Sequence, residues 1–207
     1  HHVPVRVLIS VEELAARLAR EERTVLLDVR WSLARPDGRA AHEEGHVPGA
    51  VYVDLDRYLA APPSATAGRH PLPTVDVLES AARSWGIRAG DTVVAYDDAG
   101  GLAAARAWWL LRWAGLDDVR LLDGGLAAWC AEGNDVETGP VDPPPGDVVL
   151  GSGHMPTLDA AAAADAAHDG VLLDARAAER YRGEVEPIDS RAGHIPGARS
   201  APTTENL

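Results

Sequence analysis

The sequence predicts an α/β fold built as two tandem domains, each a mostly parallel sheet flanked by helices, with the second domain incomplete in this chain. Two observations support this prediction. Short apolar runs alternate with longer segments of helical composition. A two-part motif also occurs twice, in the same order, at an offset of about 146 to 148 residues. This offset is too long for a solenoid repeat, so we interpret it as a duplicated domain.

The repeated motif joins an apolar run ending in Asp-x-Arg to the sequence Gly-His-[Val/Ile]-Pro-Gly-Ala. Its two parts are residues 26–30 and 45–50 in the first copy, and residues 172–176 and 193–198 in the second. About ninety residues follow the first copy before a proline-rich stretch, whereas only nine follow the second. We therefore expect the second domain to stop in its middle.

The first part of the chain reads as a helix, a strand, a polar insert and a second strand. Ser10 precedes a helical segment at 11–18, with Glu13 at the capping-box position. Residues 25–29 are nearly all apolar, as expected for a strand buried on both faces. After the polar insert, residues 51–53 are predicted to form the next short strand.

The same alternation continues to about residue 131. The predicted elements are a helix at 78–85 with Gly86 as its C-cap, a strand at 92–96, a helix at 102–114, a strand at 119–122 and a helix at 126–131. Trp108, Trp109 and Trp113 are predicted to pack against the sheet. Cys130, the single cysteine, is predicted to be a small buried hydrophobe.

These patterns divide the chain into three parts. The first domain is placed at residues 5–138, a stiff proline-rich and glycine-rich linker at 139–153, and the second domain at 154–207. Within the second domain, residues 160–167 are predicted to form a helix and residues 171–174 a strand.

Composition narrows the class of protein. The net charge is −13 and all nineteen basic residues are Arg, so nucleic acid is not an expected partner. The absence of Lys, with abundant Ala, is typical of a GC-rich bacterial genome.

No apolar run is long enough to span a membrane and no signal peptide is present, so we expect a cytoplasmic protein. A single Cys excludes an intrachain disulfide and a cysteine zinc cluster. We predict no cofactor.

Four features together resemble the rhodanese family, most closely its two-domain thiosulfate and 3-mercaptopyruvate sulfurtransferases. They are the Asp-x-Arg run, the Gly-His-[Val/Ile]-Pro-Gly-Ala sequence, the strand–loop–helix pattern at 96–106 and Leu-Asp-Gly-Gly-x-x-x-Trp at 122–129. The resemblance covers nearly the whole chain and implies tandem rhodanese-like domains. It also implies the chemistry: a cysteine thiolate takes a sulfane sulfur from the donor as a persulfide and passes it to cyanide or a thiol.

The resemblance also indicates where the active site would lie. In the family, the catalytic Cys ends a buried strand of the second domain, and the following backbone N–H groups surround it. The matching loop of the first domain has Asp97 at the nucleophile position, so that domain is expected to be inactive. The repeat offset places the second loop near position 243. We therefore expect the catalytic Cys to lie beyond Leu207 and this chain alone to be inactive.

Several arginines are assigned roles, and that of Arg180 comes from the resemblance. Arg180 matches the family's substrate-binding arginine, whose guanidinium pairs with donor oxygens or a carboxylate. Arg106 is predicted to form a salt bridge that ties down the Asp97 loop. Arg30 and Arg176 are predicted to be structural, each paired with a carboxylate.

Residues 42–46 also spell His-Glu-x-x-His, the zinc-protease signature. That motif requires a continuous helix, which Gly45 and Pro48 should interrupt, and the second copy keeps only His194. We predict no metal site here. His46 and His194 are expected to hydrogen-bond to the backbone in their turns.

Two hypotheses from different classes follow. The first is a sulfurtransferase whose catalytic cysteine lies outside residues 1–207. Its partners would be a small anionic sulfur donor, a thiol or cyanide acceptor and, as a separate chain, its own missing C-terminal segment. The second is a catalytically inactive rhodanese-like binding or regulatory module. The residues do not choose between thiosulfate and 3-mercaptopyruvate as donor.

Overall fold

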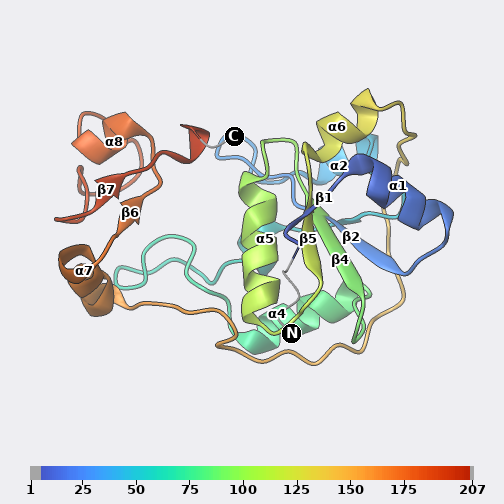
Figure 1. The fold of residues 1–207 in the computed structure, drawn as a ribbon, viewed down its shortest axis with the longest axis horizontal. Coiled ribbons are helices and arrows are strands. Elements are labelled where there is room, and N and C mark those ends of the chain that lie inside the picture. The colour runs from blue at the N-terminus through green and yellow to red at the C-terminus, as the bar shows by residue number, and fades with distance from the viewer. Residues whose placement is uncertain (1–5, 206–207) are drawn as a thin grey trace. The chain divides into compact units, whose positions relative to one another are not determined.

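The computed structural model describes residues 6–205 and divides into two compact units, His1–Met155 and Pro156–Leu207 (Figure 1). Residue 5 and residues 206–207, at the ends of the predicted domains, lie outside the described residues. Each unit is described by itself below.

The first unit is built on a parallel sheet in the order β1-β5-β4-β2-β3. Its strands are β1 (Leu8–Ile9), β2 (Thr24–Asp28), β3 (Val51–Tyr52), β4 (Thr92–Tyr96) and β5 (Val119–Leu122). The predicted α/β fold with a parallel sheet is confirmed. The short strand β1 was not predicted, because it is only two residues long and Leu8 is exposed.

In the described part of the first unit, from residue 6 onward, there are six helices: α1 (Val11–Ala19), α2 (Arg39–Glu44), α3 (Leu55–Tyr58), α4 (Val75–Ser84), α5 (Leu102–Trp113) and α6 (Gly125–Ala131). Buried residues of α4 and α5 share one hydrophobic cluster on the sheet, and those of α1 and α6 share another. Figure 1 shows the first pair of helices on one side of the sheet and the second pair on the other. Alternate residues of β4 enter the two clusters, Val93 and Ala95 on one side and Val94 and Tyr96 on the other. The sheet is therefore covered on both faces, which explains its continuous apolar strands.

The starts of α1 and α4 follow the expected capping chemistry. Ser10 Oγ accepts a hydrogen bond from the N–H of Glu13 at 3.1 Å, so the predicted N-cap of α1 is confirmed. The Glu13 carboxylate does not return to Ser10, as a capping box requires, because it pairs with Arg120 and Arg6 instead. Helix α4 begins at Val75, three residues before the predicted start, and is capped by Thr74.

The tryptophans of α5 pack as predicted. Trp113 is 9% exposed, and Trp108 and Trp109 lie partly buried against the same cluster. Cys130, however, is exposed, so the prediction of a buried cysteine was wrong. Helix α6 buries the neighbouring Trp129, which is 4% exposed, and the next residue of a helix faces a different direction.

The stretch predicted as a linker lies along α4. The Gly146 N–H donates to Arg83 O at 2.7 Å, and Arg83 Nε donates to Val148 O at 2.8 Å. Val148 and Leu150 are buried in the same cluster as α4. Apolar side chains at 148 and 150 thus hold this segment to the first unit.

The second unit repeats the beginning of the first on a smaller scale. It contains α7 (Ala160–Asp169), β6 (Leu173–Asp174), α8 (Ala178–Arg182), β7 (Arg199–Ser200) and the 3₁₀ turn η1 (Thr203–Glu205). Strand β6 pairs with β7 in parallel, as β2 pairs with β3. Within residues 6–205, no helix has both the length and the apolar character needed to cross a bilayer.

Candidate functional site

The loop between β4 and α5 encloses the carboxylate of Asp97. Oδ1 accepts hydrogen bonds from the N–H groups of Ala99 (2.9 Å) and Gly101 (2.8 Å). Oδ2 accepts from those of Ala103 (2.9 Å) and Ala104 (3.0 Å). The Asp97 residue is 1% exposed. These four amides and Asp97, here called the Asp97 cradle, form an anion-binding arrangement at the start of α5.

Glycines give the Asp97 cradle its shape. Gly100 and Gly101 have φ of 76° and 85°, a left-handed conformation that turns the chain back toward the carboxylate. Gly125 lies against the backbone of Asp97, where an added Cβ would be 2.4 Å from the carbonyl oxygen. That carbonyl accepts from the N–H of Leu126 at 3.1 Å. Because the protein's own carboxylate fills this loop, the loop holds an anion but offers no thiol.

A buried ion pair stands beside the cradle at the end of β2. Arg30 Nη2 contacts Asp28 Oδ2 at 2.6 Å and donates to Gly45 O at 2.8 Å. Tyr96 Oη donates to the same Asp28 oxygen at 2.8 Å and accepts from the N–H of Val47 at 3.1 Å. The network therefore joins both parts of the repeated motif to β4. Burial, with the neighbouring Asp28 carboxylate, raises the pKa of Tyr96, so its hydroxyl stays protonated.

The second unit repeats this network at nearly the same distances. Arg176 Nη2 contacts Asp174 Oδ2 at 2.6 Å and donates to Gly193 O at 2.7 Å. The predicted pairing of Arg30 and Arg176 with carboxylates is confirmed. Among the described residues, no tyrosine donates to Asp174 and no strand pairs with the second edge of β6. Leu173 is accordingly 60% exposed, whereas its counterpart Leu27 is 0% exposed.

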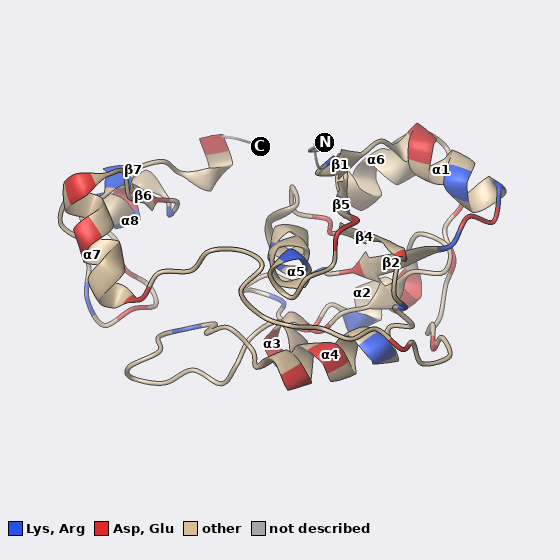
Figure 2. Ribbon diagram, turned by 60° about the horizontal axis from the view of Figure 1, so that its bottom comes forward, with Lys and Arg blue, Asp and Glu red and all other residues tan. Residues whose placement is uncertain are grey.

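Arg180, the predicted substrate-binding arginine, lies on α8. Figure 2 shows both acidic and basic residues on and around this helix. Its Nη2 donates to Glu186 Oε1 at 2.7 Å and to Asp189 Oδ2 at 2.9 Å. Its Nε donates to Glu186 Oε2 at 3.3 Å. The sequence did not indicate these two carboxylate partners, because they follow Arg180 in an irregular segment without periodicity.

The Arg180–Glu186 pair is expected to survive in acid. Hydrogen bonds from the N–H of Asp189 and from Arg180 lower the pKa of Glu186 to about 2, from an ordinary value of 4.5. Because the pKa is lower in the folded protein, the ionised Glu186 carboxylate stabilises the fold above about pH 4.5. This stabilisation is lost as the pH falls toward about 2 and the carboxylate is protonated. The carboxyl ¹³C shift of Glu186 should therefore titrate with a midpoint near 2. A midpoint near 4.5 would contradict the observed contacts.

The two histidines of the His-Glu-x-x-His sequence are buried and stacked, with ring centroids 4.0 Å apart. Helix α2 ends at Glu44, so the predicted interruption at Gly45 is confirmed. His46 Nδ1 lies 3.0 Å from Val47 O, and its Nε2 lies 3.1 Å from Gly139 O. His194 Nδ1 lies 2.7 Å from Tyr181 O. Both predicted backbone contacts are therefore confirmed.

Arg106 does not form the predicted salt bridge. Its guanidinium donates to three carbonyl oxygens, those of Leu59 (2.7 Å), His70 (2.9 Å) and Pro71 (3.2 Å). It therefore fastens the segment that precedes α4 rather than the Asp97 loop. Burial lowers the pKa of Arg106, and the three carbonyls accept hydrogen bonds from its Nε and Nη2 without a carboxylate.

Fold and loop together define a class: an α/β domain with an anion cradle where a central parallel strand meets a helix. Comparison with known proteins identifies the family. Residues 10–132 match the rhodanese-like domain family, and the chain belongs to this family.

Three similar proteins illustrate the relationship. "Putative thiosulfate sulfurtransferase SseB" of Mycobacterium tuberculosis is 47% identical over 96% of this chain and 71% of its own length. "Probable 3-mercaptopyruvate sulfurtransferase" of Pseudomonas aeruginosa is 48% identical over 97% of this chain and 72% of its own length. The crystal structure of SseA from Escherichia coli, titled as a 3-mercaptopyruvate sulfotransferase, superposes with a TM-score of 0.85 at 30% identity, covering 98% of this chain and 77% of SseA. The chain is thus a homologue of thiosulfate and 3-mercaptopyruvate sulfurtransferases.

Proposed function

We propose that this chain carries most of a sulfurtransferase that moves a sulfane sulfur from thiosulfate or 3-mercaptopyruvate to cyanide or a thiol. The nucleophile is a cysteine on a loop outside residues 1–207, at the position that the repeat places near residue 243. One observation carries the proposal. The Asp–Arg network of the second unit matches that of the first, yet the cradle-bearing loop that accompanies it in the first unit has no counterpart among the described residues.

The chemistry needs a thiolate in a cradle like that of Asp97. With thiosulfate, the thiolate attacks the outer sulfur, a new S–S bond forms, and sulfite leaves with the electrons of the old S–S bond. Cyanide then takes the outer persulfide sulfur as thiocyanate and regenerates the thiolate. Asp97 cannot perform these steps, because a carboxylate forms no persulfide. Cys130 lies on the exposed side of α6, a different element from the Asp97 cradle.

In this proposal residues 154–207, which include the second unit, are the first part of the catalytic domain. Residues 5–138 form an inactive domain, and residues 139–153 join the two. A strand–loop–helix segment would complete the second unit along the free edge of β6, as β4 and α5 complete β2. A cavity of about 810 Å³ is lined by β6, and its wall combines apolar residues such as Leu173 and Ile195 with charged residues such as Asp174. The segment could belong to the same polypeptide or to a separate chain.

Arg180 would bind the donor through its guanidinium, pairing with the oxygens of thiosulfate or the carboxylate of 3-mercaptopyruvate. Its position on α8 supports this role, because α8 follows directly after the Asp174–Arg176 network. The acceptor needs no charged site, since cyanide and thiols attack the persulfide directly.

A chimera tests the proposal. Residues 1–207 would be joined to the part of the Pseudomonas aeruginosa relative that follows its matched region, and thiocyanate formation would be measured with each donor. We expect activity in the chimera, none in residues 1–207 alone, and a loss of at least about tenfold in kcat/KM for Arg180→Gln.

Arg182→Gln is the matched control, because Arg182 lies on the same helix and forms an exposed ion pair with Glu184. It should retain nearly full activity. A folded chimera that transfers no sulfur from either donor would contradict the proposal and favour an inactive rhodanese-like binding module.

A further inference from the structure

Two carboxylates contact Arg180, and the structure holds them very differently. The Glu186 side chain is 6% exposed, and its Oε1 also accepts hydrogen bonds from the N–H groups of Ile188 (3.1 Å) and Asp189 (2.9 Å). The Asp189 side chain is 46% exposed, and among the described residues its carboxylate accepts one hydrogen bond, at 2.9 Å from Arg180 Nη2. Its charge also acts on Arg176 and helps to raise the pKa of that guanidinium. Glu186 is therefore a fixed partner of Arg180, and Asp189 is an exposed one.

The guanidinium of Arg180 has two usable edges. Nε and Nη2 face Glu186 and form a bidentate pair with it. The second edge consists of Nη1 and the other N–H of Nη2. Within residues 6–205, only Asp189 occupies this edge, through Nη2, and Nη1 has no hydrogen-bond partner. The second edge could therefore accept two oxygens of one anion, although Asp189 supplies only one.

We propose that Asp189 is an internal competitor for the sulfur donor at Arg180. The donor anion binds to Nη1 and Nη2 by displacing the Asp189 carboxylate, while Glu186 stays in place and fixes the orientation of the guanidinium. This inference rests on the proposed function, in which Arg180 binds the donor. Asp189 would then determine specificity. An anion that presents two oxygens can bind both Nη1 and Nη2 and replace the Asp189 carboxylate, which is held by a single hydrogen bond.

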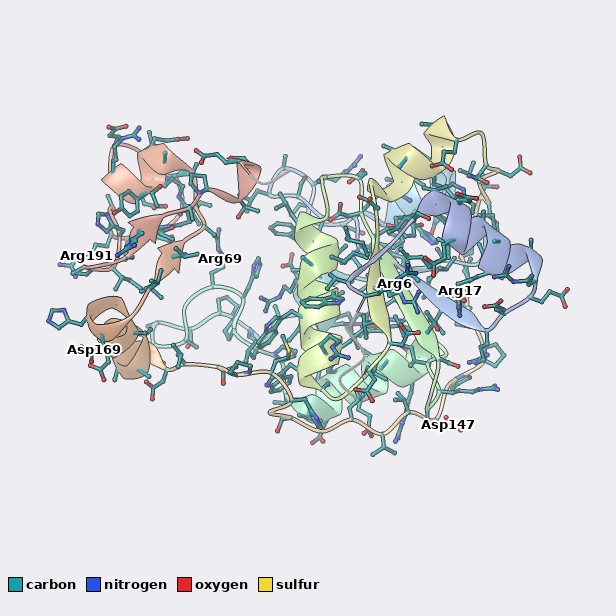
Figure 3. The ribbon with its side chains drawn as sticks, viewed as in Figure 1. Arg6, Arg17, Arg69, Asp147, Asp169 and Arg191 are labelled. Carbon is teal, nitrogen blue, oxygen red and sulfur yellow. The ribbon has the colours of Figure 1, made fainter. Side chains whose placement is uncertain are left out.

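Physical chemistry favours displacement of Asp189 rather than Glu186. An exposed ion pair contributes little to stability, because water solvates both charges when they separate. Releasing Glu186 would instead leave its backbone donors at 188 and 189 without an acceptor and break the contact with Arg176. Arg191, labelled in Figure 3, lies two residues beyond Asp189 and lines the same cavity as Asp189. Its positive charge would offset part of the repulsion that an incoming anion meets in an acidic chain.

The test measures anion binding rather than activity, so it needs no catalytic cysteine. The Nε–Hε signal of Arg180 in the ¹⁵N-labelled 207-residue chain would be followed by NMR during titration with thiosulfate or pyruvate. Chloride at matched ionic strength serves as the reference anion. Asp189→Asn removes the competing charge. Glu184→Gln, which also removes one negative charge near α8, controls for a general change in the electrostatic field.

We expect Asp189→Asn to lower the Kd of thiosulfate and of pyruvate about five- to tenfold, and Glu184→Gln to change it less than about twofold. Equal effects of the two substitutions would overturn the competitor role and leave Arg180 as a donor-binding residue. If neither anion shifts the Arg180 signal in the unsubstituted chain or in Asp189→Asn, both the competitor role and the proposed role of Arg180 fail.

Discussion

Replacing Asp28 with alanine is expected to lower the free energy of unfolding of the first unit by about 3–5 kcal/mol. The side chains of Asp28 and Arg30 are 0% and 6% exposed, so the substitution leaves a guanidinium charge buried without its carboxylate. It also removes the acceptor of the Tyr96 hydroxyl. Tryptophan fluorescence during urea unfolding measures this effect, because all six tryptophans lie between residues 31 and 129, within the first unit.

The duplication supplies a matched control. Asp174→Ala removes the corresponding carboxylate from the second unit, where Arg176 is 30% exposed and can be solvated by water. This variant should leave the tryptophan-detected transition unchanged. If Asp28→Ala lowers the free energy of unfolding by less than about 1 kcal/mol, the network does not stabilise the first unit as a buried ion pair should.

Asp97→Cys, made together with Cys130→Ser, is expected to give a thiol with a pKa at least one unit below the ordinary value of about 8.5. Two effects compete at this position. Burial disfavours the thiolate, whereas the four amides of the Asp97 cradle favour it. We expect the amides to prevail, because the loop already holds a buried carboxylate. The ultraviolet absorbance of the thiolate, followed against pH, gives the pKa without requiring a reagent to reach the site.

The unsubstituted chain provides the comparison for this experiment, since its one thiol is the exposed Cys130. A double variant whose pKa equals or exceeds that of Cys130 would mean that burial outweighs the amides. In that case the first domain would not preserve an anion cradle of the kind that the proposed catalytic loop requires.

The sequence alone predicted those elements whose local residue pattern reflects their burial in the folded structure. Strands β2 and β4 were predicted because both faces of the sheet are covered, which produces unbroken apolar runs at 25–29 and 92–96. Asp97 was singled out through the resemblance of its loop to the catalytic loop of the rhodanese family. Its four hydrogen bonds were not predicted, because they depend on the left-handed turn at Gly100 and Gly101.

The failures have physical causes of their own. Arg106 was assigned a carboxylate partner, but its guanidinium binds carbonyl oxygens at 59, 70 and 71, which lie far from it in the sequence. Cys130 was predicted to be buried because its helix is apolar, yet Trp129 fills the core position. The competing carboxylate of Asp189 lies in a segment with neither helix nor strand periodicity, so only the folded structure reveals it.

The proposal that the sulfur-carrying cysteine lies outside residues 1–207 is tested most directly by intact mass. The 207-residue chain and the chimera would each be treated with thiosulfate, then measured under denaturing, non-reducing conditions. We predict that the chimera gains the mass of one sulfur atom at its grafted cysteine and that the 207-residue chain, whose single thiol is Cys130, gains none. A persulfide on Cys130 that cyanide removes as thiocyanate would contradict the account.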